Sequence, residues 1–433
     1  MAEQQDPPCP PLKFVLLKRF GPTMTPFTVA MTGQSLIHHD IRASSDSSFH
    51  DLVQMLKTAD VAFTNLETTI TGRHPGWPMK GSFFGCSEPL VLDVLEDMGI
   101  NTLSLANNHA FDLGPGGVLS TIEEVGARGF LHAGTGADRA TAMTPRSKRL
   151  GAKTVTLAAM DAGPGPATMY ADDAASDRPA RPGVNRLEVR RLFGVDPEKF
   201  DMLTAIQSTF KSGELERANY YQPDDPPVVS DPRDIDFYGT VFRRSAQNRR
   251  HILMDQTSAS NQLAAISDAA HRGEFVIAYL HHHHWEPDWR EVPDWVRVFA
   301  RRCVDAGARI FACHGAPVLQ PMEIYKSAPL FFGLGNFIFH VPEHEAEWNS
   351  ADVWKSVVAR CCFNEGGALS AMSLEPIILG GEKSLETGLP HTRRVPVLAR
   401  SEMGRSIIAD LARRSASYGT KIEADCSSGR LVL

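Results

Sequence analysis

The chain has 433 residues, of which 42% are hydrophobic and 22% carry a charge, a composition typical of a folded globular protein. Its 44 basic and 51 acidic residues give a net charge of −7. This balance argues against nucleic acid as the main partner, because no basic face is evident. No stretch approaches the about 18 consecutive apolar residues that a membrane-spanning helix needs, so we expect no membrane span.

The seven cysteines are scattered and contain no Cys-x-x-Cys pair. An odd, scattered set is typical of reduced thiols, and it predicts a cytoplasmic location. Residues 1–27 include several prolines but lack the basic start, apolar run and cleavage site of a signal peptide. We therefore interpret them as a flexible N-terminal leader.

Short apolar runs that end in turn residues predict strands, and apolar residues three or four apart predict helices. In chain order, strands are expected at 27–32, 60–64, 100–105, 153–159, 275–280, 308–312 and 330–337, with helices at 89–98, 117–125, 258–271 and 294–306. A late antiparallel pair is expected at 357–363 and 369–378, followed by a last helix capped by Ser401. Strands that alternate with helices predict an α/β fold with a largely parallel sheet.

The pattern breaks between about residues 162 and 250, where the chain is polar and rich in proline and aspartate. Because this segment lies between core strands, we interpret it as an insertion over the active face rather than a linker. We assign the core to residues 28–380. Residues 381–433 are expected to form a C-terminal extension whose helix packs on the core.

Polar side chains follow the predicted strands, and open α/β sheets place such groups together at one edge. Five strand ends carry them: Gln34; Asn65 with Glu67; Asn108 with His109 and Asp112; His281 to Glu286; and His314. Imidazole, carboxylate and carboxamide groups together suit Zn²⁺, Mn²⁺ or Fe²⁺, and also Ca²⁺ where oxygen ligands dominate. The sequence therefore predicts a divalent metal site. The alternative for the Asn108 region is a capped turn ahead of the next helix.

Four consecutive histidines, His281–His284, leave one predicted strand. Successive residues of a strand point to opposite sides, so at most two of the four can reach one site. We favour His281, the first residue off the strand, as a ligand. Arg181 lies in the predicted insertion beside Pro182 and Gly183, where its guanidinium could bind a substrate carboxylate. The alternative for Arg181 is a solvated surface position.

With these residues in view, the chain resembles the CapA family of poly-γ-glutamate capsule biosynthesis proteins, which have a calcineurin-like metallophosphatase fold. The most specific matching element is Asn-Asn-His-x-x-Asp-x-Gly at 107–114, and a Gly-Asn-Phe element at 335–337 supports it. The other matching segments are 65–67, 276–285, 313–314 and 318–321, so the resemblance spans about residues 28–380.

The resemblance implies a layered α/β/β/α sandwich, with an inserted polar segment, around a metal centre at the strand ends. By motif position, His109 and Asp112 would form a catalytic pair, and the metal ligands would be Glu67, Asn108, His281 and His314. Two positions depart from the family pattern. Gln34 stands where the family has aspartate, and Pro317 stands where it places a second histidine. Both departures make a two-metal centre less expected.

The sequence therefore predicts a metal-dependent enzyme that acts on a peptide or poly-γ-glutamate-type substrate. The simplest reaction is amide hydrolysis by a metal-activated water, with His109 and Asp112 moving the proton. Alternatives are a peptide epimerase, with His282 among the candidates for a second catalytic group, a phosphoesterase, or a non-catalytic polyglutamate-binding protein. The candidate substrate-binding residues are Gln34, Asn65, Arg181 and Glu286.

Overall fold

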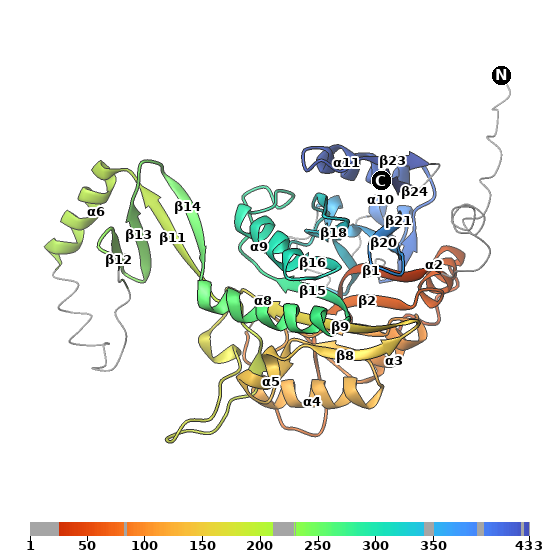
Figure 1. Cartoon of the computed structure of the whole chain (residues 1–433), viewed down its shortest axis with the longest axis horizontal. Coiled ribbons are helices and arrows are strands. Elements are labelled where there is room, and N and C mark those ends of the chain that lie inside the picture. Colours follow the sequence, from red (N-terminus) through yellow and green to blue (C-terminus); the bar gives the residue numbers. More distant parts are fainter. Residues whose placement is uncertain are drawn as a thin grey trace. The chain divides into compact units, whose positions relative to one another are not determined.

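The computed structural model describes residues 26–81, 85–210, 229, 231–341, 350–387, 394–425 and 428–432 (Figure 1). The chain divides into two compact units. The small unit is Glu188–Ala259, and the main unit comprises the chain up to Leu187 and from Ser260 onward. Residues 1–25 of the expected leader lie outside the described part, and strand β1 begins at Phe27.

The larger sheet of the main unit is mixed. Along its path lie β23 (Ile422–Asp425), β24 (Ser428–Leu431), β21 (Leu369–Leu379), β20 (Lys355–Phe363), β1 (Phe27–Leu36), β2 (Val61–Leu66), β5 (Thr102–Ser104) and β6 (Leu131–Ala133), while β19 (Asn336–Phe339) pairs with β1 and β22 (Pro396–Leu398) with β21. Five neighbouring strands of this sheet pair in parallel, in the order β19, β1, β2, β5 and β6. Strands β20 and β21 pair antiparallel, which confirms the expected late pair.

The smaller sheet of the main unit has a parallel centre. Its order is β17 (Met322–Tyr325), β18 (Ala328–Phe331), β16 (Ile310–His314), β15 (Phe275–His281), β9 (Lys153–Asp161) and β8 (Arg146–Leu150). Strands β9, β15, β16 and β18 run parallel, so their carboxyl ends lie at one edge. Two short pairs accompany the sheets: β3 (Thr69–Ile70) with β4 (Cys86–Ser87), and β7 (Thr135–Gly136) with β10 (Gly183–Val184).

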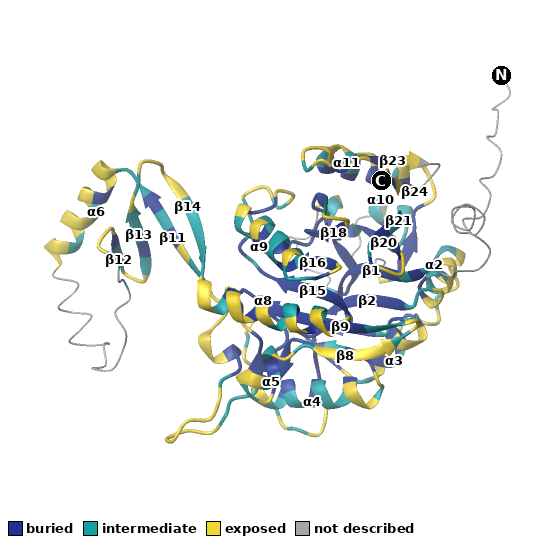
Figure 2. Ribbon diagram, viewed as in Figure 1, coloured by how far each residue is buried: buried dark blue, intermediate teal, exposed yellow. Residues whose placement is uncertain are grey.

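Alternation along the strands sends side chains into two different cores. On β2, Phe63 joins a buried cluster that also contains Tyr279 of β15, so this cluster holds residues of both sheets. Its neighbour Ala62 joins a second cluster, with Leu52 and Leu95 from helices that cover the other face of the larger sheet. Figure 2 shows the buried strands and the exposed outer surfaces of the helices. The main unit is therefore a mixed α/β fold with more than one sheet.

The described helices include five near their predicted positions, whereas the helices that begin at Ser47, Arg139, Pro197 and Glu382 were not predicted. The described helices are α2 (Ser47–Lys57), α3 (Leu90–Asp97), α4 (Gly114–Ala127), α5 (Arg139–Met143), α6 (Pro197–Thr209), α8 (Gln256–His271), α9 (Asp294–Asp305), α10 (Glu382–Thr387) and α11 (Glu402–Ala416). Ser401 caps α11 as expected, because its hydroxyl accepts a hydrogen bond from the amide of Met403 at 3.0 Å. None of the described helices combines the length and apolar character needed to cross a bilayer. The cytoplasmic location stays a prediction.

The small unit overlaps the segment predicted as an insertion, and it extends past the predicted end near residue 250 to Ala259. It contains α6 and a sheet of β12 (Asp234–Phe237), β13 (Thr240–Arg244), β11 (Val189–Val195) and β14 (Arg249–Met254). Its core includes contacts between the rings of Phe193, Phe237 and Phe242. Residues 162–187, which the prediction also placed in the insertion, belong to the main unit. The placement of the insertion over the active face stays a prediction.

Close backbone contact between β1 and the turn before β19 predicts that Gly33 tolerates no side chain. A β-carbon added there would lie 2.1 Å from the carbonyl oxygen of Gly335 and 2.9 Å from the amide nitrogen of Phe337. We expect Gly33→Ala to lower the free energy of unfolding by about 3 kcal/mol, measured by urea denaturation. The control is Gly126→Ala in α4, where the nearest atom is 3.8 Å away. Equal stability of the two variants would contradict the close contact.

Candidate metal and acid–base site

Two rows of polar side chains lie at the carboxyl ends of the parallel strands. In the smaller sheet, His281 of β15 is in register with Asp161 of β9 and with His314 of β16. In the larger sheet, Gln34 of β1 is in register with Asn65 of β2. One row therefore carries imidazole and carboxylate groups, and the other carries carboxamides.

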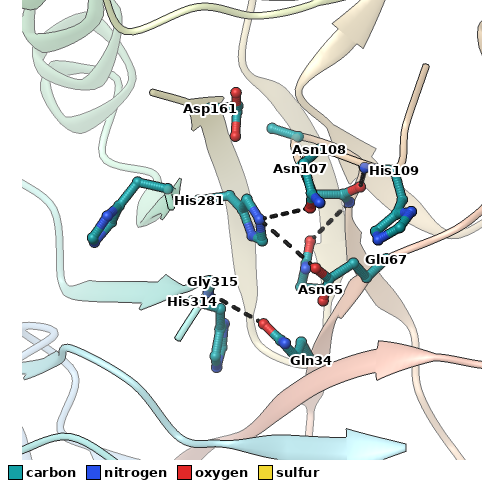
Figure 3. A network of polar contacts seen from close by, with 12 residues as sticks. Gln34, Asn65, Glu67, Asn107, Asn108, His109, Asp161, His281, His314 and Gly315 are labelled. Carbon is teal, nitrogen blue, oxygen red and sulfur yellow. Dashed lines mark hydrogen bonds and ion pairs between the residues drawn. The ribbon is translucent and has the colours of Figure 1, made fainter. Parts of the chain in front are cut away.

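His281 links the two sheets (Figure 3). Its buried ring places Nε2 3.0 Å from Oδ1 of Asn108 and 3.7 Å from Oε1 of Glu67, and no described residue is a hydrogen-bond partner of its Nδ1. Burial lowers the pKa of His281 well below its ordinary value, with help from neighbouring histidines. The imidazole is therefore neutral and has a lone pair available for a metal ion.

Glu67, His281 and His283 form a triad of possible ligands. Each offers one ligand atom, and the three atoms lie within 4.8 Å of one another. Oε2 of Glu67 and Nε2 of His283 are buried and have no hydrogen-bond partner among the described residues. Burial raises the pKa of Glu67 to about 8 and, together with nearby positive charge, lowers the pKa of His283 to about 3. Two imidazoles and a carboxylate with unfilled valences fit a divalent ion of the Zn²⁺, Mn²⁺ or Fe²⁺ type.

The four consecutive histidines alternate in direction. The rings of His281 and His283 lie on one side, with centroids 5.1 Å apart. His282 and His284 instead contact Trp295, with centroid distances of 5.1 and 6.2 Å. Nδ1 of His282 also accepts the amide hydrogen of His284 at 3.1 Å. The structure therefore places the catalytic candidate His282 against Trp295, and it brings His283 to Glu67 in its stead.

The other two predicted ligands lie beside the triad. Asn108 contacts His281 through its Oδ1. His314 is buried over Tyr279, with ring centroids 5.6 Å apart, and neither of its ring nitrogens has a hydrogen-bond partner. Burial lowers the pKa of His314 to about 3, so this imidazole is also neutral.

Asp161 is a site residue that the sequence analysis missed. Its Oδ2 accepts hydrogen bonds from the amide of Gly163 at 2.9 Å and the hydroxyl of Tyr170 at 3.0 Å, while its buried Oδ1 has no partner. Burial raises the pKa of Asp161 to about 7. The signal was available, because Asp161 ends an apolar strand in the same way as the other polar groups.

His109 and Asp112 form a hydrogen-bonded pair, with His109 Nδ1 2.7 Å from Asp112 Oδ2. Both residues are buried, and Asp112 also accepts the amide hydrogen of Gly85 at 2.7 Å. The ammonium of Lys80 lies 3.0 Å from Asp112 Oδ1. These contacts hold Asp112 in place, and Asp112 orients the His109 ring so that Nε2 is the nitrogen left for proton transfer. Burial lowers the pKa of His109, which favours its neutral, basic form.

Two predicted substrate-binding residues are bonded within the protein. Oε1 of Gln34 accepts the amide hydrogen of Gly315 at 3.2 Å, and its Nε2 donates to Oδ1 of Asn336 at 2.9 Å. Oδ1 of Asn65 accepts a hydrogen from Nδ2 of Asn107 at 3.1 Å. These carboxamides thus join the strand ends to one another.

The other two predicted substrate-binding residues are Arg181 and Glu286. Arg181 donates from Nε to the carbonyl oxygen of Tyr170 at 3.1 Å, and Tyr170 in turn contacts Asp161. Glu286 is partly buried, directly after the histidine run. Their binding roles stay predictions.

Comparison with known proteins identifies the family. The model of the family described as "Bacterial capsule synthesis protein PGA_cap" matches residues 28–341. The chain belongs to this capsule synthesis family. This finding confirms the CapA resemblance, and similarity to two CapA proteins supports it: 37% identity over 75 residues to the PGA biosynthesis protein CapA of Bacillus subtilis, and 39% over 57 residues to the capsule biosynthesis protein CapA of Bacillus anthracis. These matches cover 17% and 13% of the chain, and 19% and 14% of the two relatives.

Longer similarities extend over nearly the whole chain. Proteins y4sH and y4uA of Sinorhizobium fredii are each 29% identical to it over 455 aligned positions. Each alignment covers 94% of this chain and 93% of the relative. The family match at residues 28–341 therefore includes the small unit and part of the main unit, and the alignments to the two rhizobial proteins cover 94% of the chain.

The triad predicts that a divalent ion stabilises the protein. We expect Zn²⁺ or Mn²⁺, at a hundredfold excess over its dissociation constant, to raise the midpoint of thermal unfolding by about 4 °C or more. Glu67→Gln and His283→Ala should abolish this increase, because the first removes the negative charge of a ligand and the second removes an imidazole ligand. The control His282→Ala should keep it. An equal increase in all four proteins would contradict the assignment of the ligands.

Proposed function

We propose that this capsule synthesis family member is a metal-dependent hydrolase with a calcineurin-like metallophosphatase sandwich, and that it cleaves an amide bond in a peptide or poly-γ-glutamate-type substrate. One observation carries the proposal. The ligand triad, in which Glu67 Oε2 and His283 Nε2 are buried and lack a hydrogen-bond partner among the described residues, lies in the same network as the His109–Asp112 pair, joined to it through Asn108. Two sheets that share one core, with helices packed on the larger sheet, support the sandwich.

The substrate class is supported by the relatives and by the chemistry of the site. The Bacillus subtilis relative is named a PGA biosynthesis protein. Attack of water on an amide needs a Lewis acid that polarises the carbonyl oxygen and a base that removes a proton from the water. The network offers a place for both. Glu67, His281 and His283 would hold the metal ion. When bound, a divalent ion would supply Lewis-acid polarisation of the carbonyl oxygen.

The protein's own residues account for the proton transfers. His109 accepts a proton from the attacking water at Nε2, while Asp112 holds the Nδ1 side of the ring. The water oxygen bonds to the carbonyl carbon, and the C–N bond then breaks. His109 returns the proton to the leaving amine, so the ring ends the cycle neutral. Lys80 and the amide of Gly85 hold Asp112 in place throughout.

This proposal predicts that His109 is needed for turnover but not for metal binding. We expect His109→Ala to lower kcat by about 10²- to 10⁴-fold on a γ-linked glutamate oligomer, followed by mass spectrometry of the shortened products. Its metal content, measured by plasma mass spectrometry, should equal that of the unmodified protein. The control is His271→Ala, which changes an exposed histidine at the end of α8.

Two results would contradict the proposed hydrolysis. The first is unchanged kcat in His109→Ala, which would remove this residue from the proton transfer. The second is a metal-loaded protein that leaves the oligomer intact. If deuterium from the solvent then accumulates in the intact oligomer, the reaction is epimerisation instead.

A further inference from the structure

Residues 75–80 form a segment with unusual exposure of large apolar side chains. Trp77 is 77% exposed and Met79 is 51% exposed. Tryptophan and methionine are costly to leave in water, and neighbouring exposed ones commonly mark a binding surface. Lys80 follows directly, so the segment combines apolar area with a positive charge.

This segment is fixed to the loop that carries the His109–Asp112 pair. The amide of Met79 donates to the carbonyl oxygen of Asp112 at 2.8 Å, and the amide of Trp77 donates to that of Leu113 at 3.1 Å. The two segments also approach closely at Gly116, where an added β-carbon would lie 1.9 Å from the carbonyl oxygen of Pro75. The exposed side chains therefore sit on a preorganised backbone next to the proposed catalytic pair.

Lys80 turns toward the site. Its ammonium contacts Oδ1 of Asp112 at 3.0 Å and donates to the carbonyl oxygen of Asn108 at 2.8 Å. The Lys80 side chain is 31% exposed whereas that of Asp112 is 1% exposed, so the charge lies between the buried carboxylate and solvent. An ammonium has three N–H donors, and the described residues supply acceptors for two of them.

The charge of Lys80 acts across the site. Its ammonium contacts Asp112 and the carbonyl oxygen of Asn108, whose Oδ1 in turn contacts His281. The site contains three buried carboxyl groups, those of Glu67, Asp112 and Asp161. An anionic substrate approaching them needs a compensating cation, and Lys80 is placed to supply it.

We propose that residues Trp77–Lys80 form the recognition lip of the site, in which Lys80 binds a substrate carboxylate and Trp77 and Met79 pack on the adjoining hydrocarbon. The inference rests on the proposed function for the identity of the substrate. A γ-linked glutamyl residue matches the lip, because it carries a free carboxylate and two methylene groups beside each amide bond. The third N–H of Lys80 donates to that carboxylate.

Calorimetric binding to two probes tests this inference. The probes are a γ-linked glutamate pentamer and the same pentamer with its carboxylates converted to carboxamides. The protein is the metal-loaded full chain with His109→Ala, which prevents turnover during the measurement. Lys80→Met should weaken binding of the carboxylate pentamer about tenfold or more and leave the carboxamide pentamer unchanged. Lys80→Arg should retain most of the affinity, and Trp77→Ala should weaken binding of both probes.

The matched control is Lys326→Met. Lys326 also pairs with an aspartate, at 2.6 Å from Asp305, but it precedes β18 and so lies at the opposite edge of the smaller sheet from the site. This variant should bind both probes as the unmodified lysine protein does. A second result would assign Lys80 only a positioning role. In that case Lys80→Met lowers kcat in the otherwise unmodified chain and changes the affinity for both probes by the same factor. That result would overturn the inference.

The outcomes separate this inference from the proposed function. Discrimination by Lys80 without hydrolysis in the unmodified chain would refute the proposed hydrolysis and leave the lip standing. Hydrolysis without discrimination would refute the lip alone. Failure of the unmodified chain to bind the carboxylate pentamer would refute both.

Discussion

The site depends on buried polar atoms that lack a hydrogen-bond partner in the described part of the chain. Glu67 Oε2, His281 Nδ1 and Asp161 Oδ1 are all buried without a partner, at the edge where the parallel strands of both sheets end. Each such group costs about 1–3 kcal/mol when it is left unsatisfied. A divalent cation bound at the triad would offset this cost by ligating the lone pairs and by favouring the charged carboxylate. The strand register thus produces a binding site and a stability cost together.

The carboxamides around the triad make that arrangement rigid. Gln34 stands where the family pattern led us to expect aspartate, and it bonds at one end to Gly315 and at the other to Asn336. A neutral amide can donate and accept at once, which a carboxylate cannot. Gln34 therefore ties the ends of β16 and β19 to β1.

Much of this site followed from the sequence, because apolar strands that end in polar residues place those residues at one edge. Glu67, His281 and the His109–Asp112 pair were found in this way. The rule of alternation limited the histidine run to two inward rings, but only the path of the chain after β15 shows that His283 is the second. Lys80 had no comparable signal. It reaches Asp112 through backbone pairing between two irregular loops, which no periodicity in the sequence records.

X-ray absorption spectroscopy at the edge of the bound metal tests the central claim most directly. The account predicts a ligand shell of nitrogen and oxygen with the multiple-scattering pattern of two imidazoles. It also predicts that one imidazole is lost in His281→Ala and one in His283→Ala, while His282→Ala leaves the spectrum unchanged. A shell without imidazole, or one that is unchanged by both ligand substitutions, would contradict the assignment of Glu67, His281 and His283 as the metal-binding triad.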